Sequence, residues 1–448
     1  MTKPLYFPPE LSFLDFTEQI LGKAQDKSVP VLERFWFADI YTKNISEFIR
    51  SRVVPIKNKI KTNRLYGIQD TSASKLLKQI RQRIVELDVK RSEIYSSLRK
   101  ELSQDNKVPA LIWPEHNPCE VSLDNVQDKD ILLHFPYHSF EQIIKLLEEV
   151  ADDTDTRSIT VSMYRLAPDS AVVERLIKAV KNGKKVTAYV ETEARLDEKS
   201  NTNYISLMRT NGIRIIPKLD GWKVHAKLIL IKFKEKKSLA IISTGNLHEG
   251  TAQSYSDISL LTCDPHITYG VNGVFNFIRK REGKWADWYP LVVSPVDVRE
   301  YFIQLIDNEI SYARGGTKAE IIVKCNGLTD VPLAKKLIEA IKAGVKVALI
   351  IRGMNIINPN YTHDNLINHR IVDRFLEHAR IFSFYNNRNP RIYLGSADWM
   401  GRNLDKRIEV TVEIQDKDIK TMLDKILRFQ IDNPTKAQGK TQRLLCQK

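Results

Sequence analysis

Two stretches of this 448-residue chain share one pattern and decide its fold. Residues 173–186 read VERLIKAVKNGKKV, and residues 334–347 read AKKLIEAIKAGVKV. Each pattern predicts an amphipathic helix, a glycine that ends it and the start of a strand. The two stretches are 161 residues apart. The same offset pairs Arg165 with Asn326 and Glu191 with Arg352, at the ends of predicted strands. Unrelated β-α-β units often share a helix–Gly–Lys–Val sequence pattern, which would explain similarity in the helix alone. Agreement over three successive elements instead favours a duplicated domain.

The regions around the repeat differ in type. Short β-rich runs at 158–161 and 185–190 alternate with helical stretches, which is typical of an α/β fold. Upstream, apolar residues at helical spacing predict an all-helical domain, with one long amphipathic helix or hairpin over 72–102. The expected fold class is α/β, in which a helical domain precedes two α/β domains that form a pseudo-two-fold pair. The expected regions are the helical domain at 1–105, a linker at 106–128, the two α/β domains at 129–293 and 294–434, and a basic tail at 435–448.

Composition narrows the classes of partner and compartment. The chain holds 69 Lys plus Arg against 55 Asp plus Glu, and this net charge of +14 favours a polyanionic partner. Its four cysteines include no C-x-x-C pair, so the sequence supports neither a zinc ribbon nor a disulfide framework. No signal-peptide pattern or apolar run of about 18 residues is found. We expect a cytoplasmic protein, with peripheral contact to a membrane left open.

A candidate nucleophile lies in WKVHAKLILI, residues 222–231, which reads as a strand with alternating apolar residues. His225 and Lys227 are two residues apart and are expected to project from one face. A neutral imidazole can attack phosphorus, and an adjacent ammonium stabilises charge on the transferring group. H-x-K alone fits an ordinary strand histidine better. The balance shifts because Ser-Thr-Gly-Asn follows at 243–246, and this combination is similar to the phospholipase D superfamily arrangement.

The second half carries a matching but degraded element. His378-Ala379-Arg380 is expected to end a helix and begin a strand, and Ser-Ala-Asp-Trp follows at 396–399. The two histidines are expected to meet in one pocket between the lobes, because open α/β sheets place ligands beyond the carboxyl ends of their strands. His378 would then act as general acid–base. As an alternative, it caps a helix C-terminus.

Three arginines complete the residues that point to phosphate. Arg165, Arg195 and Arg352 each follow a predicted strand. A planar guanidinium matches phosphate oxygens better than a lysine does. Spread over two lobes, they predict a clamp on several phosphates, although any one of them fits a structural ion pair as well.

Together these features resemble the first class of bacterial polyphosphate kinases. The matching motifs are LSFLDF at 11–16, NISEF at 44–48, DILLHFPYHSF at 130–140, the stretch 371–378, and the segments 396–400 and 402–405. The resemblance implies that the two C-terminal domains are phospholipase D-like.

The resemblance also implies a role for each matching residue. The family's phosphohistidine falls on His225, with Lys227 beside it, and the second catalytic histidine falls on His378. The nucleotide-binding positions fall on Asn44, Tyr255, Asp257, Arg352, His378 and Asn246. Arg165 and Arg195 fall on the magnesium and phosphate site. Because an arginine cannot ligate a cation, we expect these two to clamp phosphates while Mg²⁺ is held by phosphate oxygens and water.

Three departures from the family pattern stand out. Ile241 occupies the place of a histidine that usually comes just before G-T-G-N, and Glu193 stands where the family carries Lys or Gln. A sizeable head domain normally separates the helical domain from the D-I-L-x-H motif, and here only the linker remains. The nucleotide and phosphohistidine positions are largely retained.

The function implied by the resemblance is reversible transfer of the γ-phosphate of ATP to inorganic polyphosphate through a phosphohistidine. Mg²⁺ is the expected cofactor, ATP and ADP are the nucleotide substrates, and polyphosphate is the polymeric partner. Nucleic acid is not an expected partner, and homo-oligomerisation is left open. Two other classes stay open: a phosphodiesterase of the phospholipase D superfamily, and a non-catalytic paralogue that binds polyphosphate or nucleotide.

Overall fold

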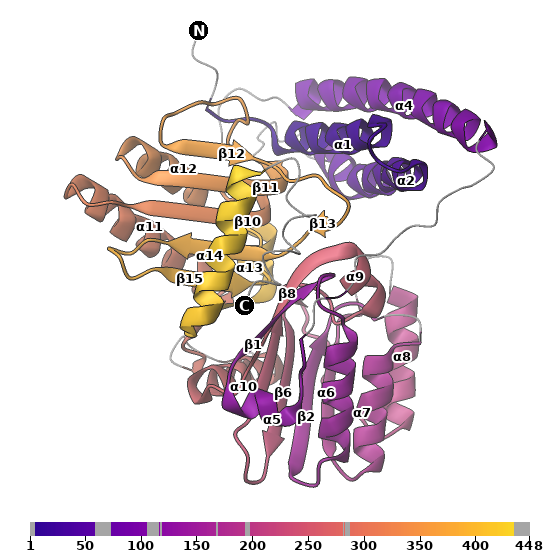
Figure 1. The fold of residues 1–448 in the computed structure, drawn as a ribbon, viewed down its shortest axis with the longest axis vertical. Helices are drawn as coiled ribbons and strands as arrows, with labels where there is room; N and C mark the ends of the chain where they lie inside the picture. The colour runs from indigo at the N-terminus through magenta and orange to yellow at the C-terminus, as the bar shows by residue number, and fades with distance from the viewer. Residues whose placement is uncertain are drawn as a thin grey trace.

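The computed structural model describes residues 5–58, 73–104, 116, 119–166, 169–192, 198–280, 282 and 287–433. The chain forms three bodies (Figure 1). A helical layer formed by α1, α2 and α4 lies beside the second α/β domain, and the first α/β domain lies below both in this view (Figure 1). This arrangement confirms the expected fold class.

The helical domain is built on one long amphipathic helix. Its elements are α1 (Pro9–Gln25), α2 (Val31–Phe48), a π-helical turn (Ile49–Val53), α3 (Val54–Asn58) and α4 (Ala73–Gln104). Pro9 starts α1, where its fixed φ suits the first helical position and its missing N–H is not needed. The predicted apolar stripe of α4 is buried, and Ile80 has no exposed surface. The expected long helix is therefore a single helix rather than a hairpin.

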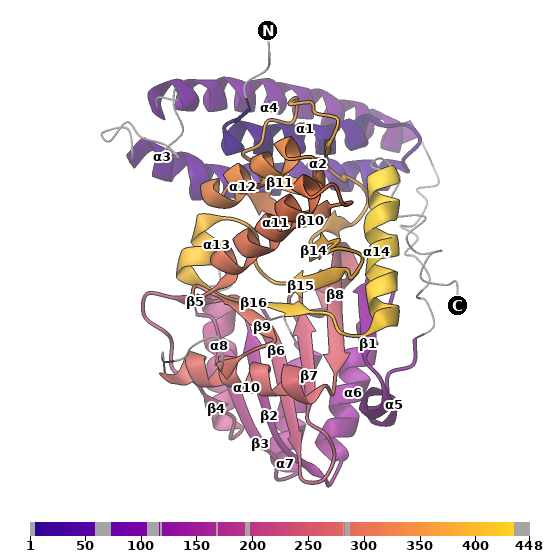
Figure 2. The same ribbon diagram turned by 90° about the vertical axis from the view of Figure 1, so that its left-hand side faces the viewer.

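The first α/β domain supplies seven strands of an eight-stranded sheet, in the order β1-β8-β7-β6-β2-β3-β4. Helices α6 and α7 pack on one face of this sheet and α10 on the other (Figure 2). Its strands are β1 (Ile131–Phe135), β2 (Thr156–Met163), β3 (Lys185–Val190), β4 (Arg214–Ile215), β6 (Lys227–Phe233), β7 (Leu239–Ser243) and β8 (Tyr255–Thr262). Its helices are α5 (Leu123–Asp128), α6 (Glu141–Asp152), α7 (Ala171–Lys181), α8 (Glu198–Thr210), α9 (Glu249–Ser254) and α10 (Pro265–Lys280).

The second α/β domain repeats this architecture. Its sheet has the order β12-β11-β10-β14-β15-β16, and β9 pairs with β16 as β1 pairs with β8. Its strands are β9 (Leu291–Ser294), β10 (Glu320–Leu328), β11 (Lys346–Asn355), β12 (Leu366–His369), β14 (Arg380–Phe384), β15 (Arg391–Gly395) and β16 (Arg407–Glu413). Its helices are α11 (Val298–Arg314), α12 (Val331–Lys342), α13 (Gly401–Lys406) and α14 (Lys417–Asp432).

The two domains exchange short strands. β5 (Lys223–Val224) belongs to the first domain in sequence but pairs with β16 of the second. In return, β13 (Leu376–Glu377) of the second domain pairs with β8 of the first. The pseudo-two-fold relation is therefore built into the backbone hydrogen bonds, and neither sheet is complete without the other domain.

This exchange corrects two expectations. Residues 222–231 are not one strand, because the chain leaves the second sheet after β5 and enters the first at β6. No helix precedes His378, which instead follows β13, so the interpretation of His378 as a helix cap is wrong. In both places the periodicity could not show the break, since β5 and β13 are only two residues long and too short to carry a pattern of their own.

Several expectations fall outside the described residues, namely Glu193, Arg195, most of the linker and the tail at 435–448. The last residues assigned to the linker form α5, whose Leu123 and Val126 pack into the core of the first α/β domain. The domain boundaries stay predictions. Among the described helices, none combines the length and apolar character that a membrane span requires.

Candidate functional site

A cavity of about 300 Å³ opens where the three bodies meet. The helical domain contributes the wall that contains Asn44, the first α/β domain contributes Arg165 and His225, and the second contributes Arg352 and His378. The expected pocket shared by two lobes is therefore present, and a third body closes one side of it.

His225 lies at the crossing between the two sheets. Its backbone N–H and that of Ala226 both donate to the carbonyl of Ile408 in β16, at 2.9 and 3.0 Å. His378 occupies the mirror position, since its N–H and that of Ala379 both donate to the carbonyl of Ser256 in β8, at 3.0 and 2.9 Å. Each histidine is thus fixed by the backbone of the opposite domain. Strand exchange brings both imidazoles to the same cavity.

A carboxylate from the opposite domain orients the imidazole of His225. Its Nδ1 lies 2.9 Å from Oε2 of Glu409, whose side chain has no exposed surface. Burial, with the nearby charges of Lys227 and Arg407, holds the pKa of His225 well below its usual value. The neutral ring therefore donates from Nδ1 to Glu409 and keeps an unprotonated Nε2. An unprotonated nitrogen beside the cavity is the form that a nucleophile needs.

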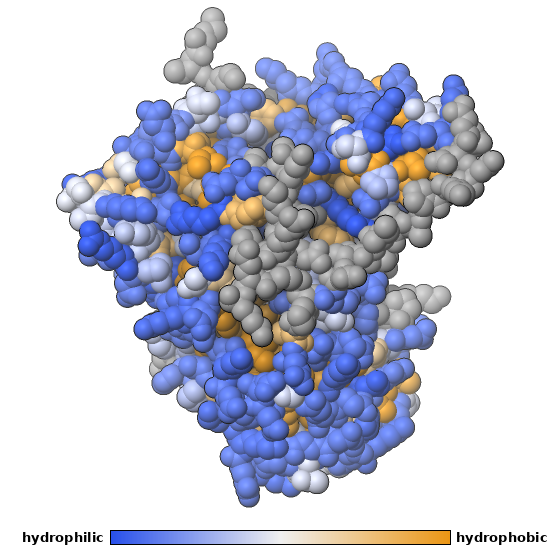
Figure 3. All heavy atoms as spheres, in the orientation of Figure 1, coloured by the Kyte–Doolittle hydropathy of each residue, from blue (hydrophilic) through white to orange (hydrophobic). Residues whose placement is uncertain are grey.

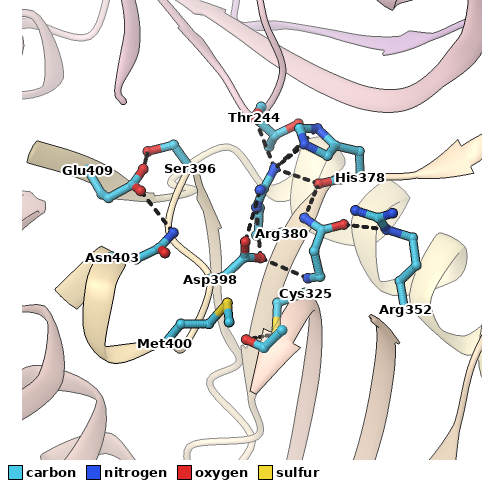
Figure 4. A network of polar contacts seen from close by, with 12 residues as sticks. Thr244, Cys325, Arg352, His378, Arg380, Ser396, Asp398, Met400, Asn403 and Glu409 are labelled. Carbon is cyan, nitrogen blue, oxygen red and sulfur yellow. Dashed lines mark hydrogen bonds and ion pairs between the residues drawn. The ribbon is translucent and has the colours of Figure 1, made fainter. Parts of the chain in front are cut away.

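Three donors hold the Glu409 carboxylate in place. Ser396 Oγ donates to Oε2 at 2.6 Å and Asn403 Nδ2 donates to Oε1 at 2.9 Å (Figure 4). His225 is the third donor. Burial nevertheless raises the pKa of Glu409 to about 6, against the lowering effect of the charges on Lys227 and Arg407. The carboxylate is ionised at neutral pH but close to its titration range.

Asp257 plays the same part for His378. Its two oxygens each lie 2.9 Å from Nδ1 of His378, and Thr244 Oγ1 donates to it at 2.7 Å. Burial opposes ionisation of Asp257, but His378, Thr244 and Arg380 hold its pKa at about 2. Burial and the charge of Arg380 lower the pKa of His378 to about 4, so this ring is also neutral at neutral pH.

Arg380 links the two halves of the site (Figure 4). Its Nη1 donates to the carbonyls of His378 and Thr244 at 2.8 and 3.2 Å. Its Nε and Nη2 donate to the two oxygens of Asp398 at 3.1 and 3.2 Å. In the duplicated architecture Arg380 stands where Lys227 stands in the first domain, and both are buried. The fully paired guanidinium acts as a fixed positive charge beside the cavity.

Lys227 lies behind His225 rather than in the cavity wall. Its Nζ donates to the carbonyl of His225 at 2.5 Å and lies 5.3 Å from the centre of the Tyr164 ring. Burial, with the charges of Arg380 and Arg407, holds the pKa of Lys227 well below its usual value. Lys227 therefore contacts the backbone of the candidate nucleophile from behind, and its burial weakens the positive charge that it can offer there.

Five of the residues predicted to bind nucleotide line the cavity: Asn44, Tyr255, Arg352, His378 and Asn246. Within the described residues, neither Nδ2 of Asn44 nor Oδ1 of Asn246 has a hydrogen-bond partner, although both atoms are buried. Buried polar atoms are usually paired, so these two are available to a ligand. Asp257 is the exception, because it lies behind His378 and contacts that ring.

Arg352 is held by the helical domain. Its guanidinium lies over the ring of Phe16 in α1, 5.7 Å from the ring centre, and its Nε donates to Asn326 Oδ1 at 2.8 Å. Ser12 of the same helix accepts from the backbone N–H of Asn355 at 3.2 Å, which anchors α1 on the end of β11. The motif at 11–16 thus positions the arginine of the second lobe.

The cavity wall is strongly basic. Its arginines and lysine greatly outnumber its carboxylates, Glu47 and Asp398, and Asp398 is paired with Arg380. The basic residues are Arg52, Arg165, Lys223, Arg352, Arg380, Arg402 and Arg407. Such a wall suits a ligand with several phosphates. Among the described residues, no group of three or more His, Cys, Asp or Glu side chains is arranged to hold a metal ion.

The main functional residue that we did not predict is Glu409. A signal for it exists in the spacing, because Ser396 and Glu409 are 13 residues apart, as are Thr244 and Asp257. Arg52, Lys223 and Arg407 were also missed, since each comes to the cavity only through packing between domains. Ile241 lies in the core of the first α/β domain on β7, with no exposed surface.

Comparisons with known proteins agree with one another. Sequence profiles described as polyphosphate kinase N-terminal domain, C-terminal domain 1 and C-terminal domain 2 match residues 6–108, 121–284 and 291–445. A polyphosphate kinase from Vibrio vulnificus (strain CMCP6) is 39% identical over 351 residues, which cover 77% of this chain and 50% of that protein. One from Yersinia pestis is 42% identical over 320 residues, covering 70% and 46%.

A similar fold is known in a solved structure. The crystal structure of polyphosphate kinase from Porphyromonas gingivalis aligns over 99% of both chains, with a TM-score of 0.84 and 22% sequence identity. The present chain spans about half the length of the curated relatives that it matches.

Proposed function

The chain belongs to the polyphosphate kinase family, and on that basis we propose that it transfers the γ-phosphate of ATP reversibly to inorganic polyphosphate through a phosphohistidine at His225. The observation that carries this proposal is the pairing of His225 Nδ1 with the buried carboxylate of Glu409, 2.9 Å away, beside a cavity lined with basic side chains. The pairing leaves Nε2 as the reactive atom.

In the first half-reaction, Nε2 of His225 attacks the γ-phosphorus of ATP. A nitrogen–phosphorus bond forms, the bond from the γ-phosphorus to the β,γ-bridging oxygen breaks, and ADP leaves with that electron pair. The imidazolium that results is stabilised by Glu409 through Nδ1. The cations of Arg352, Arg380 and Arg407 spread the charge of the transferring group, which is the main requirement in phosphoryl transfer.

In the second half-reaction, a terminal oxygen of polyphosphate attacks the phosphohistidine. The nitrogen–phosphorus bond breaks, and neutral His225 returns. His378 faces the same cavity and is neutral, so it can accept or donate a proton at the attacking or leaving oxygen. Because a phosphohistidine is itself a good donor, the reverse reaction, which makes ATP from polyphosphate, is expected as well.

Nucleotide binding would use the three bodies together. Asn44 and Tyr255 lie on the cavity wall, with the Tyr255 ring 5.2 Å from that of His378. Arg165 would clamp phosphates from the first lobe and Arg352 from the second; Arg195 remains a prediction outside the described residues. The described residues do not form a metal-ligand cluster, so Mg²⁺ would enter as the magnesium complex of the nucleotide.

An assay of ATP-dependent polymer formation tests the proposal. The wild-type protein should lengthen a polyphosphate primer in the presence of MgATP, and His225→Ala should abolish this activity. Hydrolysis of a phosphodiester such as bis-p-nitrophenyl phosphate without polymer formation would instead assign the chain to the diesterases. Binding of polyphosphate without either reaction would make it a non-catalytic member of the family.

A further inference from the structure

The first α/β domain carries a second concentration of positive charge, away from the cavity. Helix α10 covers β6 and β7 on one face of the sheet, and β2, β3 and β4 extend beyond it on that face (Figure 2). Five basic residues lie in this region, and we call them the basic sheet face: Arg157, Lys185, Arg214, Lys232 and Arg279. On the opposite face the sheet is covered by α6 and α7, so the hydrophilic surface seen there belongs to helices (Figure 3).

Strand register places these residues side by side. Ser158 of β2 lies opposite both Lys185 of β3 and Lys232 of β6. Thr187 of β3 lies opposite Arg214 of β4. Directly paired residues point to the same side of a sheet, so the lysines and the arginine share one face with these hydroxyls.

The remaining two arginines complete the face. Arg157 occupies an irregularity in the β2–β6 register next to Lys232, and Arg279 lies near the end of α10. Burial, with the positive charges of Arg279 and Arg157, lowers the pKa of Lys232, and burial, with the charge of Arg214, lowers the pKa of Arg279. The strand register and these shifts agree that the like charges lie near one another.

The basic sheet face lacks acidic partners. Within the described part of the chain, none of its five residues forms an ion pair with a carboxylate. Lys232 and Arg279 instead donate to the neutral amides of Asn272 and Asn276, at 2.8 and 3.4 Å. Elsewhere on this domain, surface lysines are paired, as Lys178 is with Asp152 and Lys236 with Asp153. Unpaired like charges cost free energy unless an anion binds them.

We propose that the basic sheet face is a second binding site for polyphosphate, which holds a distant part of the polymer whose end is in the cavity. The identity of the polymer rests on the proposed function. Lys227, behind the nucleophile, and Lys232 are five residues apart on β6, so the two sites are separated by roughly 17 Å along the strand at about 3.3 Å per residue. A long chain can occupy both sites at once, whereas a short chain can occupy only one, and the cavity, with its seven basic residues, is the stronger of the two.

The chemistry of the face favours polyphosphate over nucleic acid. Its residues offer cations together with hydroxyls such as Ser158 and Thr187, which bind phosphate oxygens. Sites for single-stranded nucleic acids usually add exposed aromatic rings on which bases stack. Among the described residues, the large exposed aromatics are Tyr269 and Tyr289. Tyr289 lies on none of the elements of this face, and Tyr269 lies on α10 ten residues before Arg279, about 15 Å along the helix from it.

A charge-neutralising variant tests this proposal. Lys185, Arg214 and Arg279 are exposed, so changing all three to glutamine should leave the fold intact. A control variant with the same loss of charge changes Lys145, Lys335 and Lys425, which are exposed residues on other helices. Binding of long and short polyphosphate, and of single-stranded RNA, is measured without nucleotide over a range of salt concentrations. Thermal denaturation verifies folding of both variants.

For long polyphosphate, the triple variant should bind about tenfold more weakly than the control. The slope of log K against log salt should fall by about 2, as expected for three lost phosphate contacts at about 0.7 each. Binding of short chains should change less than twofold. Equal losses for long and short chains, or no difference from the control, would overturn the proposal, and so would a loss confined to RNA. These binding measurements contain no nucleotide and so do not depend on catalysis. A failure of the separate polymer-formation assay would therefore refute the proposed function and leave the result on the basic sheet face unchanged.

Discussion

Replacing Glu409 with glutamine should slow phosphorylation of His225 without weakening nucleotide binding. The carboxylate accepts three hydrogen bonds, from His225, Ser396 and Asn403. An amide has a single acceptor oxygen, so at least one donor loses its partner. A hydrogen bond to a charged group contributes about 1.5–3 kcal/mol. At about 1.4 kcal/mol per factor of ten, we expect kcat to fall about 10- to 100-fold.

Rapid-quench measurement of the phosphoenzyme provides the assay. Because Glu409 does not line the cavity, the KM for ATP should stay within about twofold of wild type. The pH profile gives a second readout. Since the pKa of Glu409 is about 6, the wild-type rate should fall as the pH drops through 6, when the carboxyl gains a proton. Glu409→Gln should lack that inflection.

A matched control exists on the same strand. Glu413 is also a carboxylate of β16, but it pairs with Arg391 away from the cavity. Glu413→Gln should therefore keep kcat within twofold. If Glu409→Gln also left the phosphorylation rate unchanged, the reasoning that this carboxylate selects the reactive tautomer of His225 would be refuted.

Three further predictions concern other parts of the site. A Cβ at Gly245 would lie 2.0 Å from Oδ2 of Asp257, so Gly245→Ala should displace that carboxylate from its histidine and lower kcat at least tenfold in steady-state assays; unchanged kcat would contradict this. Phe16→Leu removes the ring under Arg352, a contact of about 0.5–2 kcal/mol, and should raise the KM for ATP about two- to thirtyfold; an effect on kcat alone would argue against a positioning role. Buried neutral histidines gain protons on unfolding below about pH 6.5, so the melting temperature should fall steadily from pH 6.5 to 4, and a flat profile would contradict the lowered pKa values of about 3 for His134 and about 4 for His138 and His378.

Much of the fold could be predicted because the repeat is local. The helix at 173–181 and its counterpart at 334–342 carry the same glycine and the same apolar spacing, and both form where expected. The exchange of β5 and β13 could not be predicted. Each is two residues long, and its partner strand lies in the other domain, so nothing in the local pattern marks it.

The candidate site divides in the same way. His225 was found because H-x-K is a motif within three residues, and Arg352 because it ends a repeated strand. Glu409 and Arg407 reach the site only through the pairing of β16 with β5, which depends on the docking of two domains. Lys227 and Asp257 were predicted as site residues, but burial places them behind the histidines rather than in the cavity wall. Sequence motifs thus reveal the reactive groups more readily than the groups that orient them.

Identification of the phosphorylated residue tests the central claim most directly. The protein is incubated with γ-labelled MgATP, digested, and the labelled peptide is sequenced. We predict acid-labile label on Nε2 of His225, which passes to polyphosphate when the polymer is added and is absent from His225→Ala. Polymer synthesis with label on another residue, or with none on His225, would contradict the account.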